Sequence, residues 1–371
     1  MGHTRQQLLL FIGIITSMLK DFKVNPNGDR ESHSIDKVNF LNIIPLNQTK
    51  QPRPYLIIGF DTEYQSTDRL VKNRIYCDND VLSYQFYCSL ITSDNKGSEL
   101  EWGGIILPDS NSIEDRLTIK EFIEFSIGEG IRKNPKIRIP RDIYFVSHFT
   151  RCDIPGFKDF KDVKNIPRLN FQNIRGSFVN VSQDLPIVLN DTTTNDEIKV
   201  FIKVRDTIHL SPQQSGSLDK LGDILGFEKI KLGRNSIEEK EIKTHMKDFL
   251  DSDWERFREY GIRDSEICVR WVNHLIRLNH EVHNHQPNNF KLPLTLSAIG
   301  VSLLEKHWLD NNSSRLEIVN LEETIKKTWD VRFGRFRYTK KERYKEEFSW
   351  VEDFITQSYH GGRNEQFWFG Q

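Results

Sequence analysis

The sequence predicts an α/β fold with a mixed β-sheet, and two observations lead to this prediction. Short apolar runs typical of buried strands alternate along the chain with segments whose apolar residues recur at helical spacing. The strand-like runs are also rich in aromatic and β-branched residues. With 371 residues and 37% hydrophobic content, the chain is long and apolar enough to bury a core, and two domains are expected.

Each expected element has its own signal. Tyr55–Phe60 is a continuous apolar run, which predicts a buried strand. Val81–Thr92 combines aromatic and β-branched residues and predicts a second strand, whereas Thr118–Ile131 has apolar residues at helical spacing. Residues 183–197 are rich in Asp, Asn and Thr and predict a polar loop. Further strands are expected at 102–107, 143–146 and 200–204, and further helices at 218–225 and 253–278.

The chain is expected to contain three segments. Residues 1–54 form an N-terminal extension, in which the apolar run 8–19 is too short to span a bilayer and is followed by a polar linker. Residues 55–285 form the main α/β domain. Residues 286–371 form a connecting segment that begins after a Gln-Pro pair.

Charge and cysteine content limit the partners and compartments that are expected. The 52 Lys and Arg residues are matched by 53 Asp and Glu residues, so binding to nucleic acid has to come from a local patch, and no membrane binding is expected. The 4 cysteines form no C-x-x-C pair, which argues against a zinc site or a disulfide framework. Reduced thiols and a cytoplasmic location are therefore expected.

The first chemical signal is a pair of carboxylates, Asp61 and Glu63, at the end of the first apolar run. Side chains at i and i+2 of a strand point to the same face, where two carboxylates repel each other unless a cation lies between them. Hard divalent ions such as Mg²⁺ prefer such oxygen ligands. An ordinary solvated strand end is the alternative interpretation.

Two more acidic positions join this pair. Tyr260 and Asp264 are four residues apart on the predicted helix 253–278 and share a face close to its apolar stripe, so Asp264 is expected to need a partner or a metal. Asp153 follows the predicted strand 143–146. Asp153 can also cap a helix, because Pro155 lies where a first helical turn would begin.

Taken in order, the motifs FDTEY (60–64), SHFTRCD (147–153) and YGIRD (260–264) resemble those of the 3′–5′ exonuclease domain of the DEDD superfamily, in its tyrosine variant. They are similar to the proofreading domain of family B DNA polymerases, in particular the bacterial, plasmid and protein-primed branch. The resemblance implies an RNase H-like fold and two-metal hydrolysis of the 3′ terminal phosphodiester of single-stranded DNA. It implies that two Mg²⁺ or Mn²⁺ ions are held by Asp61, Glu63, Asp153 and Asp264. It also implies that Tyr260 orients the attacking water.

The resemblance extends to residues that would contact the DNA. Thr62 lies within the first motif, and Thr207 and Ile208 match the segment that contacts the single-stranded 3′ end in this family. Many relatives have an Asn four residues before the Asp of the second motif. This chain has Phe149 there, preceded by His148, and a Phe at this place can stack on a base instead.

A catalytic lysine is implied near the end of the segment 217–231. Protein-primed relatives carry such a residue about here, and Lys229 and Lys231 both match its position. A lysine near the scissile phosphate offsets developing negative charge. The sequence does not choose between the two lysines, and each is equally compatible with a solvated surface position.

The C-terminal part adds two signals. Residues 326–345 interleave nine Lys or Arg residues with aromatic residues, a composition typical of nucleic-acid contacts but also of a solvated amphipathic strand or helix. Tyr359, Gly361 and Gly362 resemble the Y-x-G-G motif between the exonuclease and polymerase domains of family B enzymes, where it contacts DNA. The D-x-x-S-L-Y-P and D-T-D motifs of a polymerase palm are not found. DNA synthesis is therefore not expected from this chain alone, and a palm on a separate chain is an expected partner, in a bacterial, phage or plasmid context.

Two other functions stay open. One is a stand-alone DEDD nuclease that acts on RNA, against which the Y-x-G-G motif argues. The other is a non-catalytic DNA-binding or assembly subunit of a split polymerase. A histidine cluster at 280–285 is a further candidate for zinc, but no Cys or acidic ligand pattern accompanies it.

Overall fold

The structure is a computed structural model that describes residues 54–72, 74–91, 99–110, 112–164, 171–174, 177–181, 184–190, 197–212, 216–282, 292–311, 314–330 and 334–351. The expected N-terminal helix and linker, His283 and His285 of the histidine cluster, and the Y-x-G-G motif lie outside these residues. The chain divides into two compact units, Met1–Leu296 and Ser297–Gln371.

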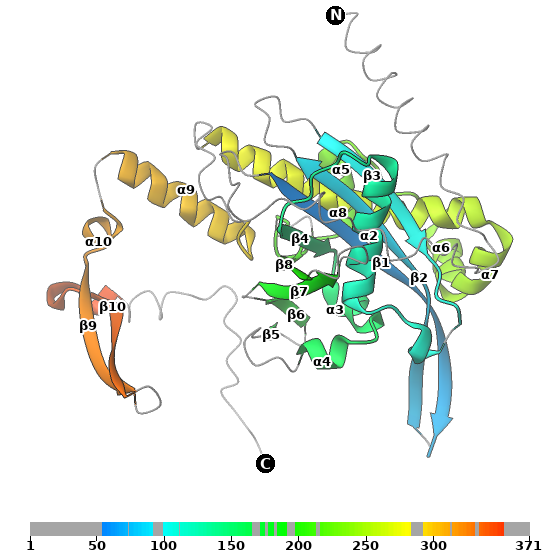
Figure 1. The fold of residues 1–371 in the computed structure, drawn as a ribbon, viewed down its shortest axis with the longest axis horizontal. Helices are drawn as coiled ribbons and strands as arrows, with labels where there is room; N and C mark the ends of the chain where they lie inside the picture. The colour runs from blue at the N-terminus through cyan, green and yellow to red at the C-terminus, as the bar shows by residue number, and fades with distance from the viewer. Residues whose placement is uncertain are drawn as a thin grey trace, which may run out of the picture. The chain divides into compact units, whose positions relative to one another are not determined.

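A six-stranded mixed sheet forms the centre of the first unit (Figure 1). Its strands are β1 (Tyr55–Val71), β2 (Arg74–Ile91), β3 (Glu99–Ile106), β4 (Asp142–Ser147), β7 (Leu185–Asn190) and β8 (Glu197–Asp206). They lie in the order β3-β2-β1-β4-β8-β7. Strands β1, β4 and β8 run parallel to one another, whereas β2 is antiparallel to β1 and to β3, and β7 is antiparallel to β8. The predicted α/β class with a mixed sheet is confirmed.

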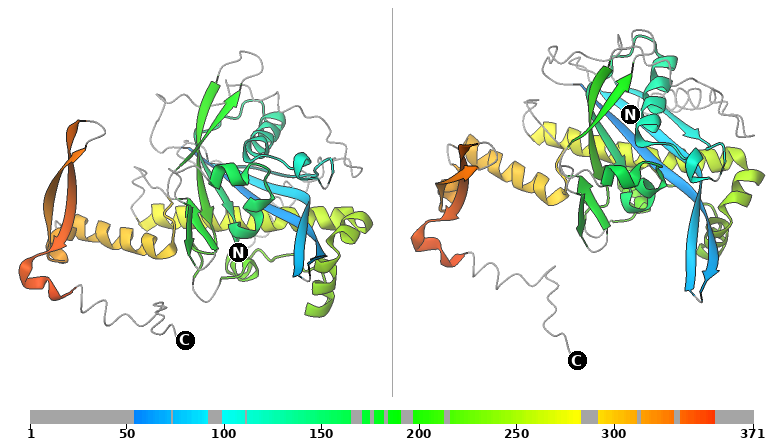
Figure 2. Two further views of the ribbon diagram at one scale, coloured as in Figure 1. Left: turned by 90° about the horizontal axis from the view of Figure 1, so that it is seen from below. Right: turned by 60° about the horizontal axis from the view of Figure 1, so that its bottom comes forward.

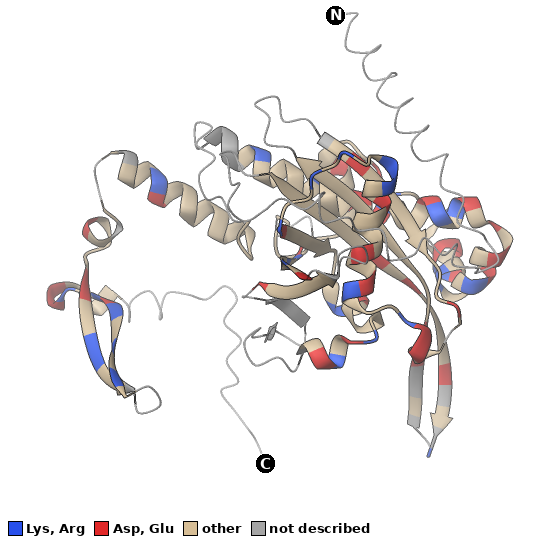
Figure 3. Ribbon diagram, in the orientation of Figure 1, with Lys and Arg blue, Asp and Glu red and all other residues tan. Residues whose placement is uncertain are grey.

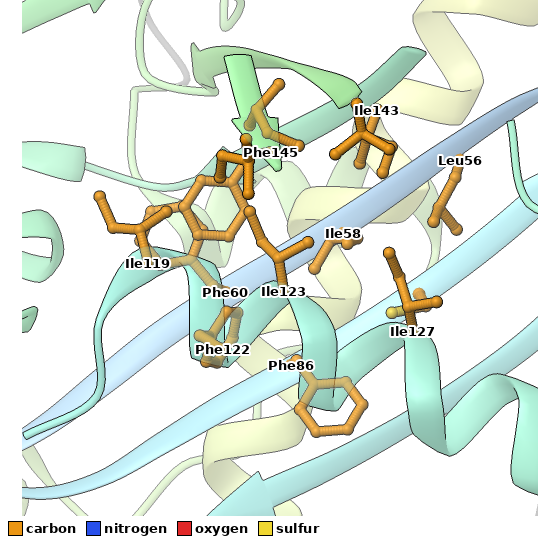
Figure 4. Close-up of a cluster of buried hydrophobic side chains, with 14 of the residues drawn as sticks. Leu56, Ile58, Phe60, Phe86, Ile119, Phe122, Ile123, Ile127, Ile143 and Phe145 are labelled. Atoms are coloured by element: carbon orange, nitrogen blue, oxygen red, sulfur yellow. The ribbon is translucent and has the colours of Figure 1, made fainter. Parts of the chain in front are cut away.

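Helix α2 (Ile119–Lys133) covers one face of this sheet. Thr118 begins the helix with a capping box, because it and Glu121 each satisfy the backbone N–H of the other. Phe122 packs against Phe60 of β1 and Phe145 of β4, with ring centroids 6.3 and 5.8 Å apart. Figure 4 shows this buried cluster, in which alternate residues of β1 point toward α2. The apolar run of the first strand is thus explained by burial on both faces of the sheet.

Helix α8 (Trp254–Val282) covers the opposite face and packs against β1, β2 and β3. The approach is close at Gly59, where an added Cβ atom would lie 2.4 Å from the carbonyl oxygen of Ser265. Glycine is therefore required at this crossing, and it lets the helix backbone lie directly on the strand that carries Asp61.

Beyond the sheet, β1 from Tyr64 to Val71 and β2 from Arg74 to Val81 continue as a two-stranded ribbon, which Figure 1 shows as the long arm below the sheet. The other elements of this unit are short. They are η3 (Ile113–Asp115), α3 (Thr150–Asp153), η4 (Ile154–Gly156), α4 (Phe160–Lys164), β5 (Phe171–Ile174), β6 (Ser177–Val181), α5 (Leu218–Leu225), α6 (Ser236–Thr244) and α7 (Met246–Ser252). Strands β5 and β6 form a separate antiparallel pair.

One expectation for this unit is wrong. The polar loop predicted at 183–197 contains β7, whose Leu185, Ile187 and Leu189 alternate toward the core. The acidic and polar residues 191–196 dominated the composition of this window and hid a short edge strand with period-2 alternation.

The second unit contains α9 (Leu296–Asp310), α10 (Arg315–Ile318), β9 (Leu321–Asp330), β10 (Arg335–Tyr344) and η5 (Glu346–Phe348). Strands β9 and β10 pair as an antiparallel hairpin, seen from two further sides in Figure 2. The basic and aromatic stretch 326–345 is therefore a β-hairpin rather than a helix. No helix within the described residues is both long and apolar enough to cross a membrane.

Candidate active site

The candidate site lies where β1 meets α3 and α8. Asp61 and Glu63 are on β1, directly after the segment that pairs with β4, and a register shift follows Glu63. Such a bulge re-aims the side chains around it. Asp153 ends the short helix α3, and Asp264 lies on α8. Glu63, Asp153 and Asp264 are buried, and Asp61 is partly buried.

Thr62 connects the first strand to the second motif. Its hydroxyl donates a hydrogen bond to Asp153 Oδ1 at 2.9 Å. Next to it, Tyr64 donates a hydrogen bond from its hydroxyl to the Cys152 carbonyl oxygen at 2.8 Å. Asp153 makes no side-chain cap hydrogen bond to the helical turn that follows it, so the helix-capping alternative for this residue is wrong.

Helix α8 brings Tyr260 and Asp264 to the same place, one turn apart on its inner face. The ammonium of Lys229 forms a salt bridge with Asp264 Oδ2, and it lies 5.0 Å from the centre of the Tyr260 ring. Lys229 is thereby part of the cluster. Lys231 is not: it pairs with Asp219 Oδ1 at 2.6 Å, and more than half of its side chain is exposed.

The pKa values of all four carboxylates are raised. Burial, followed by the nearby charge of Asp264, raises the pKa of Asp61 to about 7. Burial and the charge of Asp61 raise the pKa of both Glu63 and Asp153 well above the usual range. Burial also raises the pKa of Asp264, although Lys229 opposes the shift. Negative charge is therefore concentrated here and only partly neutralised.

These residues suit a hard cation, although they do not form a finished cage. Within the described ranges, no three His, Cys, Asp or Glu side chains are already arranged around a common metal position. Lys229 and Thr62 hold one oxygen of Asp264 and one of Asp153. Asp264 Oδ1, however, is buried and has no hydrogen-bond partner in the part of the chain that the structure describes. An orphaned carboxylate oxygen close to the charges of Asp61 and Glu63 is what a divalent ion would satisfy.

Asp206, the last residue of β8, organises the second motif and was not singled out from the sequence. Its carboxylate accepts the backbone N–H groups of Phe149 and Thr150, both at 2.9 Å, and that of Ile208 at 3.0 Å. The Thr150 hydroxyl donates to the same carboxylate. Phe149 has φ 67°, a left-handed conformation that few non-glycine residues adopt. Asp206 thus fixes the turn that leads into α3 and Asp153.

The residues expected at the DNA end lie around this turn. Thr207 is fully buried, and its hydroxyl donates to the Ser147 carbonyl oxygen at 3.1 Å. His148 Nδ1 lies 2.9 Å from the same hydroxyl, and burial lowers the pKa of its imidazole. Ile208 and Phe149 are partly exposed. Tyr359, Gly361 and Gly362 lie outside the described residues.

Comparisons with known proteins relate the chain to a DNA polymerase by its sequence. No protein-family model matches the sequence. Over 329 residues, the chain is 28% identical to the primer-independent DNA polymerase PolB of Escherichia coli. The chain is a distant relative of part of a family B DNA polymerase. The match covers 85% of this chain but 35% of PolB, so the chain spans about a third of that relative's length.

A solved structure, the strand transfer complex of the Drosophila P element transposase, is also matched. The match has a TM-score of 0.19 and 11% sequence identity, and it covers 70% of this chain and 67% of that one. A TM-score this low does not establish a shared fold. The relation to PolB therefore rests on sequence, and the site rests on the arrangement of its own residues.

Proposed function

We propose that this chain is the 3′–5′ exonuclease part of a family B DNA polymerase and removes nucleotides from the single-stranded 3′ end of DNA. The single observation that carries the proposal is the convergence of Asp61, Glu63, Asp153 and Asp264 from three separate elements, with Tyr260 and Lys229 beside them. We also infer an RNase H-like sheet from the strand order β3-β2-β1-β4-β8, in which β1, β4 and β8 are parallel and β2 is antiparallel to both of its neighbours. The proposal concerns hydrolysis alone.

Four carboxylates would hold the metal ions. Asp61 and Glu63 project from one strand, while Asp153 and Asp264 approach from α3 and α8. Two bound Mg²⁺ or Mn²⁺ ions would activate a water and stabilise the 3′-oxygen leaving group of an in-line displacement. Raised pKa values reduce the negative charge of the carboxylates, and the ammonium of Lys229 neutralises part of the rest.

Tyr260 has a position suited to the attacking water. Burial and the nearby carboxylates raise the pKa of its phenol, so the hydroxyl stays protonated and can donate or accept a hydrogen bond without acting as a metal ligand. Burial lowers the pKa of Lys229, but the charge of Asp264 and its hydrogen bond outweigh this effect. The pKa is therefore raised overall, and the ammonium stays charged. A fixed positive charge at this place offsets charge that develops on the phosphate.

The turn at 148–149 supplies a surface for the terminal nucleotides. Phe149 is partly exposed, and Asp206 holds its backbone N–H. An aromatic ring on a backbone fixed in this way can stack on the terminal base and replace the amide that many relatives place there. Ile208 follows Asp206 and would provide a second apolar contact.

The proposal is tested with a 5′-labelled single-stranded DNA oligonucleotide incubated with the purified chain. With Mg²⁺ or Mn²⁺ we expect a ladder that shortens from the 3′ end, and with EDTA we expect none. Asp61→Asn should abolish the ladder, whereas Asp68→Asn, an exposed carboxylate farther along the same strand, should not. A ladder that persists in Asp61→Asn, or that forms equally in EDTA, contradicts the proposal.

An RNA oligonucleotide of the same sequence separates the proposed substrate from the alternative. The 2′-hydroxyl is the group that distinguishes the two strands at a site. Faster degradation of DNA supports the proofreading assignment. Faster degradation of RNA would support a stand-alone DEDD nuclease instead, and binding of DNA without cleavage would support a non-catalytic subunit.

A further inference from the structure

The β9–β10 hairpin of the second unit has solvent on both faces. Gly334, which precedes β10, and the residues of β10 from Arg335 to Arg343 are all exposed. On β9, Ile325 and Trp329 are 64% and 51% exposed. A two-stranded hairpin with no buried face is marginally stable in water, so a ribbon of this kind is expected to gain stability from a partner.

The register separates the side chains of the hairpin into two different faces. Residues directly opposite each other in an antiparallel pair lie on the same face, and neighbours along a strand alternate. Trp329 is opposite Phe336, and Lys327 is opposite Tyr338. These four residues, together with Ile325 farther along β9, lie on what we call the aromatic face.

The other face, which we call the basic face, has a different character. Thr328 is opposite Arg337, Lys326 is opposite Thr339, and Thr324 is opposite Lys341. Lysine, arginine and threonine therefore alternate across this side. Figure 3 shows Lys and Arg along both strands of the hairpin. Two acidic residues form ion pairs near the open end of the hairpin, away from its turn. Glu322 pairs with Arg343, and Glu323 pairs with Lys340.

The aromatic face is built for flat rings. Trp329 and Phe336 are in edge contact, with ring centroids 4.8 Å apart. The Lys327 ammonium lies 4.0 Å from the centre of the Phe336 ring and 5.9 Å from that of Tyr338. Phe336 and Tyr338 are 49% and 65% exposed. Exposed rings held in place by a cation offer stacking positions at a low cost in conformational entropy.

We propose that the β9–β10 hairpin of the second unit is a binding surface for single-stranded DNA, made of residues other than those of the hydrolytic site. Bases stack on Trp329, Phe336 and Tyr338, and Lys327 meets the phosphate between them. The basic face supplies the positive potential that attracts the strand. The chain has a net charge of −1, so any DNA binding requires a local surface of positive charge. The choice of DNA as the ligand rests on the proposed function.

Binding is measured by fluorescence anisotropy of a labelled oligothymidylate of about 16 nucleotides, enough for one binding site. The full chain is used in EDTA, which prevents cleavage. The triple variant Trp329→Ala, Phe336→Ala, Tyr338→Ala should bind about 100-fold more weakly or worse, because each stacked base is lost with its ring. Ile325→Ala, an exposed apolar residue on the same face, is the matched control and should bind within about twofold of the unchanged chain.

An abasic strand of equal length shows whether stacking is the cause. The unchanged chain should bind it weakly, and the aromatic substitutions should weaken that binding no further. Trp329→Phe keeps a ring and should retain most of the affinity. Lys327→Gln should flatten the dependence of log K on log salt by about 0.7, the contribution of one phosphate contact on a single strand.

Three results would overturn the inference. They are equal binding of oligothymidylate by the triple variant, equal affinity for abasic and normal strands, and loss of binding in Ile325→Ala or Trp329→Phe as large as in the triple variant. Tighter binding of duplex than of single strand would also overturn it. The proposed hydrolysis is judged separately, since Asp61→Asn should bind normally without cutting, and the triple variant should still cut an oligonucleotide of about four nucleotides.

Discussion

The carboxylate of Asp206 accepts the backbone N–H of Phe149 at 2.9 Å, and Phe149 is held at φ 67° in the left-handed region. The strand end of β8 therefore sets the conformation of the turn after β4. Since α3 begins at Thr150 and ends at Asp153, this contact also sets the position of a candidate metal ligand. Positive φ at a non-glycine residue is costly and persists where the surroundings enforce it.

Phe149→Asn should therefore stabilise the protein. Asparagine tolerates the left-handed region better than phenylalanine, so we expect the free energy of unfolding to rise by about 0.5–1 kcal/mol. Denaturant unfolding measures the change, and Phe149→Ala is the control, because alanine keeps the unfavourable φ and also loses the ring. A stabilisation by alanine as large as that by asparagine would show that the ring, not the backbone, is responsible.

Asp206→Asn should destabilise the protein and impair cleavage. Both carboxylate oxygens of Asp206 accept backbone N–H groups, so the amide nitrogen of asparagine faces a donor whichever way it is placed. We expect a loss of about 3 kcal/mol in unfolding free energy. Asp219→Asn is the matched control, because Asp219 is partly exposed and pairs with Lys231, and it should cost less than about 1 kcal/mol. Equal effects of the two substitutions would contradict the role given to Asp206.

Lys229→Gln and Lys231→Gln should differ sharply in cleavage rate. Lys229 is partly buried and forms a salt bridge with Asp264, so its loss should lower the rate about 100-fold, the usual effect of removing a donor that stabilises developing charge. Lys231→Gln should stay within about twofold, because its pair with Asp219 is exposed. Single-turnover cleavage of a labelled strand at saturating Mg²⁺ gives both rates. Comparable losses would mean that the geometry does not distinguish the two lysines.

The stability of the metal-free protein should fall as the pH rises from about 4 to about 7. Burial and the charge of Asp264 raise the pKa of Asp61 to about 7, whereas an unfolded Asp titrates near 3.9. Between these values the folded chain holds a proton that the unfolded chain has lost, so this contribution is complete at low pH and disappears above about pH 7.

Asp61→Asn should remove the part of this pH dependence that comes from Asp61 and leave the part that comes from Glu63, Asp153 and Asp264. At pH 8 in EDTA, the variant should be more stable than the unchanged chain by about 1–3 kcal/mol, with allowance for the partial exposure of Asp61. Thermal unfolding measures both chains, and Mg²⁺ should stabilise the unchanged chain more than the variant. Identical melting temperatures of the two chains in EDTA would show that the charge of Asp61 does not destabilise the folded protein.

The sequence predicts the sheet and helices best where burial imposes a pattern. The run 55–60 is apolar because β1 lies between α2 and α8, yet β1 continues to Val71, where it pairs with β2 alone and shows no core-facing pattern. Helix α6 was not predicted because it buries no residue and so has no apolar stripe. For α6 and the outer part of β1, the lack of burial explains the missing pattern, whereas β7 is buried and its alternation was hidden by the polar residues that follow it in the sequence.

The candidate site follows the same logic. The spacing of Asp61 with Glu63 and of Tyr260 with Asp264 is readable because a strand and a helix have fixed periods. The choice between Lys229 and Lys231 is not readable, because both lie in the irregular segment after α5, where no period relates sequence to direction. Asp206 was missed because its role is to accept backbone N–H groups from a turn far away in sequence.

Gly59→Ala should increase the distance between the site residues on β1 and those on α8. An added Cβ would lie 2.4 Å from the Ser265 carbonyl oxygen and 2.6 Å from a methyl of Val269, so α8 has to move away from β1. We expect a loss of about 3 kcal/mol or more in unfolding free energy, because a backbone atom cannot rotate aside.

The matched control is Gly128→Ala in α2, where an added Cβ meets no atom within 4 Å. This change should be neutral or should stabilise the helix by up to about 1 kcal/mol. In Gly59→Ala that remains folded, cleavage should fall more than binding to DNA, because Asp264 and Tyr260 move relative to Asp61 while the β9–β10 hairpin is unchanged. A folded Gly59→Ala protein that cuts at the normal rate would show that the spacing of α8 from β1 does not set the chemistry.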